Sequence, residues 1–130
     1  MAQQSPRVGP LQWAIILLAL ATALIHIYIA FFVMPSTPDA IFLLNGLGYL
    51  GLTAALYLPL GFLVRWRSLV RWVLIGYTAL TVLLWVFMVL LPGTTTATGW
   101  IAKAIEVTLI VLLFLDGQRD TAPGAPRPEQ

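Results

Sequence analysis

The hydrophobic positions of this chain fall into four long blocks separated by short polar breaks. The blocks cover residues 11–33, 40–64, 69–91 and 99–115. A helix of about 20 residues crosses the hydrocarbon core of a bilayer, which is about 30 Å thick. The pattern therefore predicts an all-α membrane protein with four transmembrane helices in an up-down bundle, because short breaks join consecutive helices in opposite directions.

The breaks contain residues that end helices. Residues 34–39 read MPSTPD and residues 92–99 read PGTTTATG, so both breaks combine proline with turn-forming residues. Pro59 lies inside the second block and predicts a bend or an early helix end near the membrane surface. Residues 1–10 form a short N-terminal segment, whereas residues 116–130 are rich in proline and charge and should form a disordered tail.

Composition agrees with a membrane protein. The 130 residues are 60% hydrophobic and 9% charged, whereas soluble domains carry roughly 25% charged residues. The first block is too long for the apolar core of a cleaved secretory signal, which spans about 7–15 residues. There are no cysteines, which excludes disulfides, thiolate metal sites and thiol redox chemistry.

Basic residues give the expected orientation. Arg7 precedes the first block. Arg65, Arg67 and Arg71 lie at the boundary between the second and third blocks, and Arg119 and Arg127 follow the fourth. The other two breaks contain no Lys or Arg. Because basic residues concentrate in cytoplasmic loops, we expect a multi-pass plasma-membrane protein with both termini in the cytoplasm.

The second block contains a G-x-G-x-x-G pattern at Gly46, Gly48 and Gly51. In a nucleotide site this pattern follows a strand and opens a soluble helix, but here apolar sequence surrounds it, so we expect no nucleotide. The helical period places Gly48, Gly51 and Ala55 on the face of Asn45, with Gly46 pointing away. The three small residues predict a helix-packing stripe, since small side chains allow close helix approach in lipid.

Strongly polar residues inside apolar blocks are candidates for a site because they are costly in lipid. Counting about 1.5 Å per residue from the outer helix ends, several polar or amphipathic residues reach roughly 10 Å in depth. They also share faces with small residues or threonines. We therefore predict an inward-facing polar layer in the outer third of the membrane, built from His26, Asn45, Trp85, Lys103 and Glu106.

Two interpretations of this layer remain open. In the structural one, Lys103 and Glu106 pair at i, i+3, and His26 and Asn45 complete a network that fixes the neighbouring helices. In the other, Glu106 and His26 exchange protons or hold a cation. A haem or pigment is not expected, since the chain has one His and a second ligand would have to be Met34 or come from a partner. No metal is expected, because two good ligands are too few.

The runs HIYIAFF, FLLNGLGYLGL, LIGYTALTVLLW and KAIEVTLIVLL resemble a family of small four-helix integral membrane proteins of uncharacterised function. The resemblance covers about residues 11–115 and implies the four-span fold, without a substrate or cofactor. We expect a non-enzymatic accessory or binding subunit. The alternative is an oligomeric proton-coupled transporter of a small solute that uses Glu106 and His26. Expected partners are the lipid bilayer and a larger membrane complex or homo-oligomer, with no nucleic acid.

Overall fold

The computed structural model of the protein describes residues 8–35 and 38–121. Over these residues the regular secondary structure is entirely helical, and its elements are α1 (Pro10–Phe32), α2 (Ala40–Tyr57), α3 (Gly61–Val64), α4 (Arg67–Trp85), η1 (Val86–Leu90) and α5 (Ala97–Thr121). The five residues of η1 form a π-helical turn that continues α4. The all-α prediction is confirmed for the described part of the chain.

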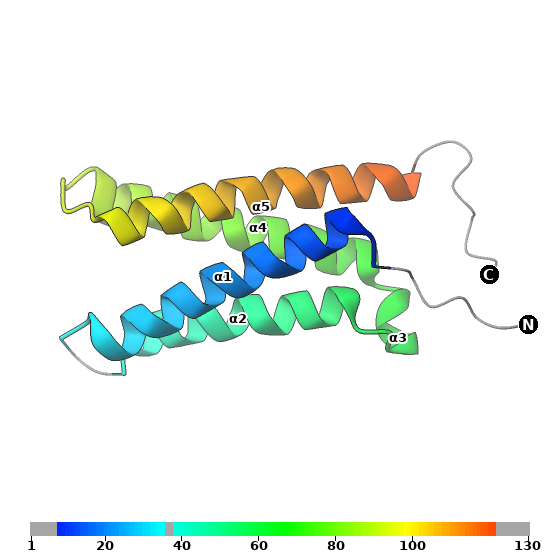
Figure 1. Ribbon diagram of the computed structural model, residues 1–130, viewed down its shortest axis with the longest axis horizontal. Coiled ribbons are helices and arrows are strands. Elements are labelled where there is room, and N and C mark those ends of the chain that lie inside the picture. Colours follow the sequence, from blue (N-terminus) through cyan, green and yellow to red (C-terminus); the bar gives the residue numbers. More distant parts are fainter. Residues whose placement is uncertain (1–7, 36–37, 122–130) are drawn as a thin grey trace, which may run out of the picture.

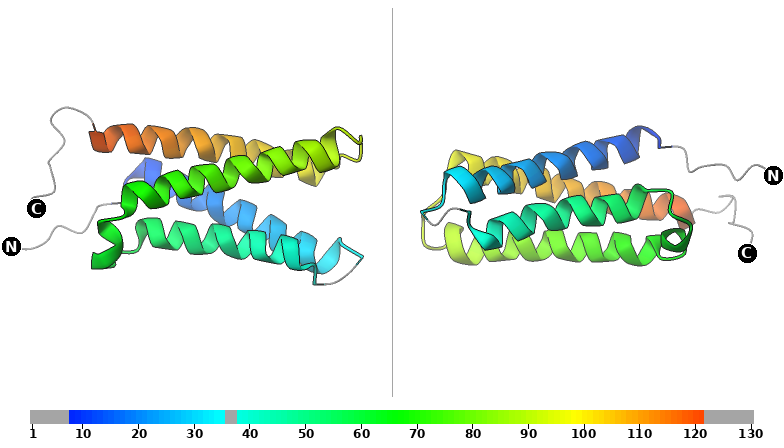
Figure 2. Two further views of the ribbon diagram at one scale, coloured as in Figure 1. Left: turned by 180° about the vertical axis from the view of Figure 1, so that it is seen from behind. Right: turned by 90° about the horizontal axis from the view of Figure 1, so that it is seen from below.

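The long helices form an up-down bundle (Figure 1), in which the start of α1 and the end of α5 lie at the same end. Helix α1 contacts α2 and α5, and α4 contacts the same two helices, so the four form a closed ring of neighbours (Figure 2). The segments Pro10–Phe32, Ala40–Tyr57, Arg67–Leu90 and Ala97–Asp120 are long and apolar enough to cross a membrane. By helix composition this is a multi-pass membrane protein.

Local sequence explains where α2 begins and ends. Asp39 caps its first turn, because its carboxylate accepts hydrogen bonds from the backbone N–H groups of Ile41 and Phe42 at 3.0 and 3.1 Å. The helix ends at Tyr57, two residues before Pro59, as the missing amide hydrogen of proline predicts. The second predicted block therefore contains two helices, since α3 follows the break.

The last helix is longer than the sequence pattern suggests. Helix α5 continues to Thr121, so residues 116–121, which were expected to begin a disordered tail, are helical. Asp116 explains part of this extension, because it is 3% exposed and continues the buried stripe of Leu109 and Leu113. The rest of the expected tail, and most of the N-terminal segment, lie outside the described residues.

The predicted packing stripe on α2 is displaced by about one residue. Gly46, expected to point away, is buried, and a Cβ atom there would lie 2.7 Å from Ile27 and 2.9 Å from the carbonyl oxygen of Ala23. Gly48 does lie at a close contact, with Tyr77 of α4, but Gly51 has open space around it. The prediction was wrong for Gly46 and Gly51 because it took the Asn45 side as the inward face.

The face of α2 that points into the bundle carries Gly46, Tyr49, Thr53 and Leu56. Their spacing of three and four residues is that of a helix packing against neighbours. Ala55, the third residue of the predicted stripe, is only half-buried. The inward face thus points between α1 and α4, the two helices that α2 contacts.

Candidate functional site

Helices α1 and α5 bring together four buried polar side chains, which we call the α1–α5 cluster. Thr22 and His26 lie one turn apart on α1, and Lys103 and Glu106 lie at i and i+3 on α5. Their exposed fractions are 0%, 3%, 7% and 0%, in that order. Because charge is costly inside a membrane span, these groups require partners from the protein.

Glu106 is at the centre of this cluster. Its Oε1 accepts a hydrogen bond of 3.0 Å from Thr22 Oγ1, and its Oε2 accepts one from Lys103 Nζ. The Nε2 atom of His26 lies 3.6 Å from Oε1, which is longer than an ordinary hydrogen bond. Lys103 therefore turns inward to the carboxylate, and the two opposite charges neutralise each other inside the span.

The orientation of His26 follows from its other nitrogen. Its Nδ1 lies 2.8 Å from the backbone carbonyl oxygen of Thr22. A carbonyl oxygen only accepts, so Nδ1 carries a hydrogen and donates it. The rings of Phe42 and Tyr49 lie against the imidazole, with centroid distances of 6.1 and 5.9 Å. As a result Nε2 points toward Glu106, and it faces the carboxylate with a lone pair when the imidazole is neutral.

The structure brings together three of the five residues of the predicted polar layer, namely His26, Lys103 and Glu106. Asn45 belongs to a different contact, between α2 and α4. Its backbone oxygen and its Oδ1 both accept from Tyr77 Oη, at 2.8 and 2.9 Å. The prediction for Asn45 was wrong because its depth in the membrane is compatible with contacts to either neighbouring helix.

Trp85 also lies apart from the cluster. It is half-buried and packs edge to face against Trp100, with ring centroids 4.9 Å apart. A Cβ atom on Gly99 would lie 3.1 Å from the Trp85 indole nitrogen, so the absence of a side chain at Gly99 lets the ring fit. Trp85 therefore joins the last turn of α4 to the first turn of α5 rather than the polar layer.

A second cluster lies at the opposite end of the bundle, where α1 begins and α5 ends. We call it the four-helix cluster because every long helix contributes to it, through Gln12, Tyr57, Arg71, Asp116 and Asp120. Asp116 Oδ1 accepts from Gln12 Nε2 at 2.8 Å. Asp116 Oδ2 accepts from Tyr57 Oη and Arg71 at 3.3 Å each. The same Arg71 nitrogen lies 2.6 Å from Asp120 Oδ2.

Sequence reasoning missed the four-helix cluster. Arg71 counted as a residue of the basic loop, and Asp116 as the first residue of the tail. A signal was present in the spacing, since Arg71 precedes Leu74 and Thr78 on the buried stripe of α4. Extending each buried stripe to the next residue at i+3 or i+4 would have included both charges.

Comparisons with known proteins give no match to a protein-family model, a curated protein or a solved structure. The resemblance to small four-helix membrane proteins of uncharacterised function is therefore left as an expectation from the sequence. Functional inference depends on the two clusters themselves.

Proposed function

We propose that the protein is a non-enzymatic accessory or binding subunit of the plasma membrane. The observation that carries this proposal is the coordination of Glu106 by its own chain. Both carboxylate oxygens have partners, supplied by Thr22 and Lys103, and the residue is fully buried. A carboxylate that binds substrate or a cation must release such partners in each cycle. One that holds two helices together keeps them.

The proposed orientation has both termini in the cytoplasm. Among the described basic residues, Arg65, Arg67 and Arg71 lie at or next to the start of α4, and Arg119 lies in the last turn of α5. These helix ends lie together in the bundle (Figure 2). The concentration of arginine at one end supports a cytoplasmic location for it.

A second candidate, an oligomeric proton-coupled transporter of a small solute, has one observation in its favour. His26 Nε2 and Glu106 Oε1 lie 3.6 Å apart within the span. With Nδ1 already donating to Thr22, one added proton would fit between the imidazole and the carboxylate. A transporter would load and release this proton during each cycle.

Proteoliposomes containing a trapped pH-sensitive dye distinguish the two candidates. After a pH jump, we expect the full chain to give the same proton flux as the Glu106→Gln/Lys103→Met double variant, in which the cluster is uncharged. In parallel, native mass spectrometry of the chain extracted in mild detergent from its own host should show a complex of fixed stoichiometry. A wild-type flux well above that of the double variant would overturn the proposal in favour of transport.

A further inference from the structure

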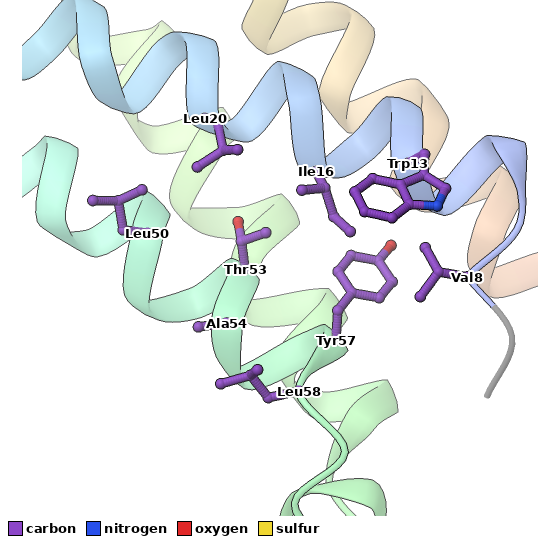
Figure 3. Close-up of a pocket in the computed structure, with 9 residues that line it drawn as sticks. All are labelled: Val8, Trp13, Ile16, Leu20, Leu50, Thr53, Ala54, Tyr57 and Leu58. Carbon is purple, nitrogen blue, oxygen red and sulfur yellow. The ribbon is translucent and has the colours of Figure 1, made fainter. Parts of the chain in front are cut away.

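Two adjoining cavities lie at the end of the bundle that carries the four-helix cluster. The first is an open apolar groove of about 340 Å³ between α1 and α2. The second is a polar pocket of about 160 Å³ among the residues of the four-helix cluster. Both are lined by Val8 and Tyr57. In Figure 3 the Tyr57 ring extends toward Trp13, with Val8 beside it, so this ring separates the apolar groove from the polar pocket.

The groove fits a hydrocarbon chain. Its walls are Trp13, Ile16 and Leu20 from α1, Leu50 and Ala54 from α2, and Leu58 just after the end of α2 (Figure 3). Several of these face outward, since Trp13 is 55% exposed and Leu58 is 49% exposed. In a membrane-spanning helix pair such positions face lipid. An acyl chain is therefore the apolar molecule that reaches this groove directly.

The polar pocket contains donors without acceptors. Arg71 lines it, is 5% exposed, and its Nε is buried with no hydrogen-bond partner among the described residues. A buried donor without an acceptor is costly. Arg67 also lines the pocket and uses its Nε for the backbone oxygen of Leu56 at 3.2 Å. Its two terminal nitrogens have no hydrogen-bond partner within residues 8–35 and 38–121, so the pocket presents guanidinium donors suited to a phosphate.

The pocket also presents negative charge. Asp116 is occupied by Gln12, Tyr57 and Arg71. Asp120, by contrast, has a side chain that is 57% exposed and pairs with Arg71 through Oδ2, which leaves Oδ1 as an acceptor. Two arginines and two aspartates give the pocket no net charge. A ligand that itself carries one phosphate and one ammonium group matches this arrangement better than an anion does.

From the two adjoining cavities we infer a binding site for one phospholipid that has a primary amine in its headgroup. The acyl chain lies in the groove, the phosphate binds the terminal nitrogens of Arg67, and the ammonium group donates to Asp120. A quaternary ammonium has no N–H to donate, so phosphatidylcholine fits less well. Phosphatidylglycerol lacks the cation and leaves Asp120 next to an anionic lipid. The site does not depend on the proposed accessory function.

Native mass spectrometry of the full chain in mild detergent tests this site, with phosphatidylethanolamine, phosphatidylglycerol and phosphatidylcholine of identical acyl chains added in turn. One phosphatidylethanolamine per chain should be retained under activation that strips the other two lipids. Arg67→Gln should weaken its binding about tenfold, because a charge-assisted hydrogen bond is lost. Arg65→Gln is the matched control, since Arg65 is exposed and lies outside the residues that line the pocket.

The groove is tested separately. Ala54→Leu fills it and should lower retention of phosphatidylethanolamine, whereas Ala104→Leu, at an exposed position of α5, should not. The helical circular dichroism spectrum verifies that each variant is folded. Equal retention of the three lipids, a preference for phosphatidylglycerol, or equal binding by the Arg67→Gln and Arg65→Gln variants would each overturn the inference.

Discussion

The two clusters use similar chemistry in different surroundings. In the α1–α5 cluster, Glu106 is 0% exposed and Lys103 is 7% exposed, and the two charges pair within α5 where it faces α1. In the four-helix cluster, Arg71 and Asp116 are equally well buried, but the Asp120 side chain is 57% exposed. The first cluster lies within the span, and the second lies at the end of the bundle. The position of a charged residue along its helix therefore decides whether the protein itself must supply all of its partners.

This difference has an energetic basis. Opposite charges interact more strongly as the effective dielectric falls, and an unpaired charge is correspondingly more costly. Glu106 is therefore expected to contribute more to the free energy of unfolding than Arg71. Near the bundle end water and lipid headgroups can compensate a charge that the protein does not fully pair, as at Asp120, whose side chain is 57% exposed.

The largest expected effect is that of Glu106→Gln. It leaves Lys103 buried without its counter-charge and should cost about 4 kcal/mol of unfolding free energy. Lys103→Met should cost less, since Thr22 and His26 still lie against the carboxylate. The double variant should recover much of the loss. Denaturant titration in detergent micelles measures all three, and a double variant as unstable as Glu106→Gln would contradict the ion-pair interpretation.

Arg71→Met should have the next largest effect, about 3 kcal/mol, because a buried ion pair in the four-helix cluster is broken. Gln12 and Tyr57 still donate to Asp116, which limits the loss. Since Asp120 is exposed, added salt should weaken the contribution of Arg71 but leave that of Glu106 unchanged. The same titration, repeated at low and high NaCl concentration, tests this. If salt lowered the contributions of Arg71 and Glu106 to the free energy of unfolding equally, the expected difference between the two clusters would be contradicted.

The α1–α5 cluster was partly predictable from the sequence because polar residues stand out inside an apolar span. His26, Lys103 and Glu106 were recognised in this way, and their shared depth followed from the helical rise. Depth does not specify which neighbour a helix faces. Asn45 and Trp85 have suitable depths but pack between other helices, with Tyr77 and Trp100.

The four-helix cluster was not predicted, for a related reason. Charged residues at span ends are expected to be in water, so Arg71 and Asp116 did not stand out. Only the register of α4 and α5 shows that both point inward. The same uncertainty of about one residue in register displaced the packing stripe on α2, where Gly46 rather than Gly51 lies against a neighbouring helix.

Gly46→Leu tests whether the packing of α2 supports the α1–α5 cluster. A side chain there must displace Ile27 and the backbone of Ala23, which flank His26 in sequence, and should cost about 1–3 kcal/mol. Gly51→Leu is the matched control, because nothing lies within 4 Å of a Cβ at that position. Thermal melting in detergent compares the two variants. Equal melting temperatures would show that the close approach of α2 to α1 at Gly46 is not needed.

The smallest expected effect is the coupling between His26 and Glu106. The two residues share a buried site, and their nearest polar atoms are 3.6 Å apart. A double-mutant cycle with His26→Ala and Glu106→Gln should therefore give a coupling energy of about 1 kcal/mol. A parallel cycle with Arg71→Met and Glu106→Gln compares one residue from each cluster. It should give no coupling energy, because sites without shared partners behave additively. Coupling in the first cycle alone would show that the clusters are independent, with His26 a member of the α1–α5 cluster. If the first cycle is additive, His26 is a neighbour of Glu106 without an energetic link to it, and the proton-sharing alternative loses its basis.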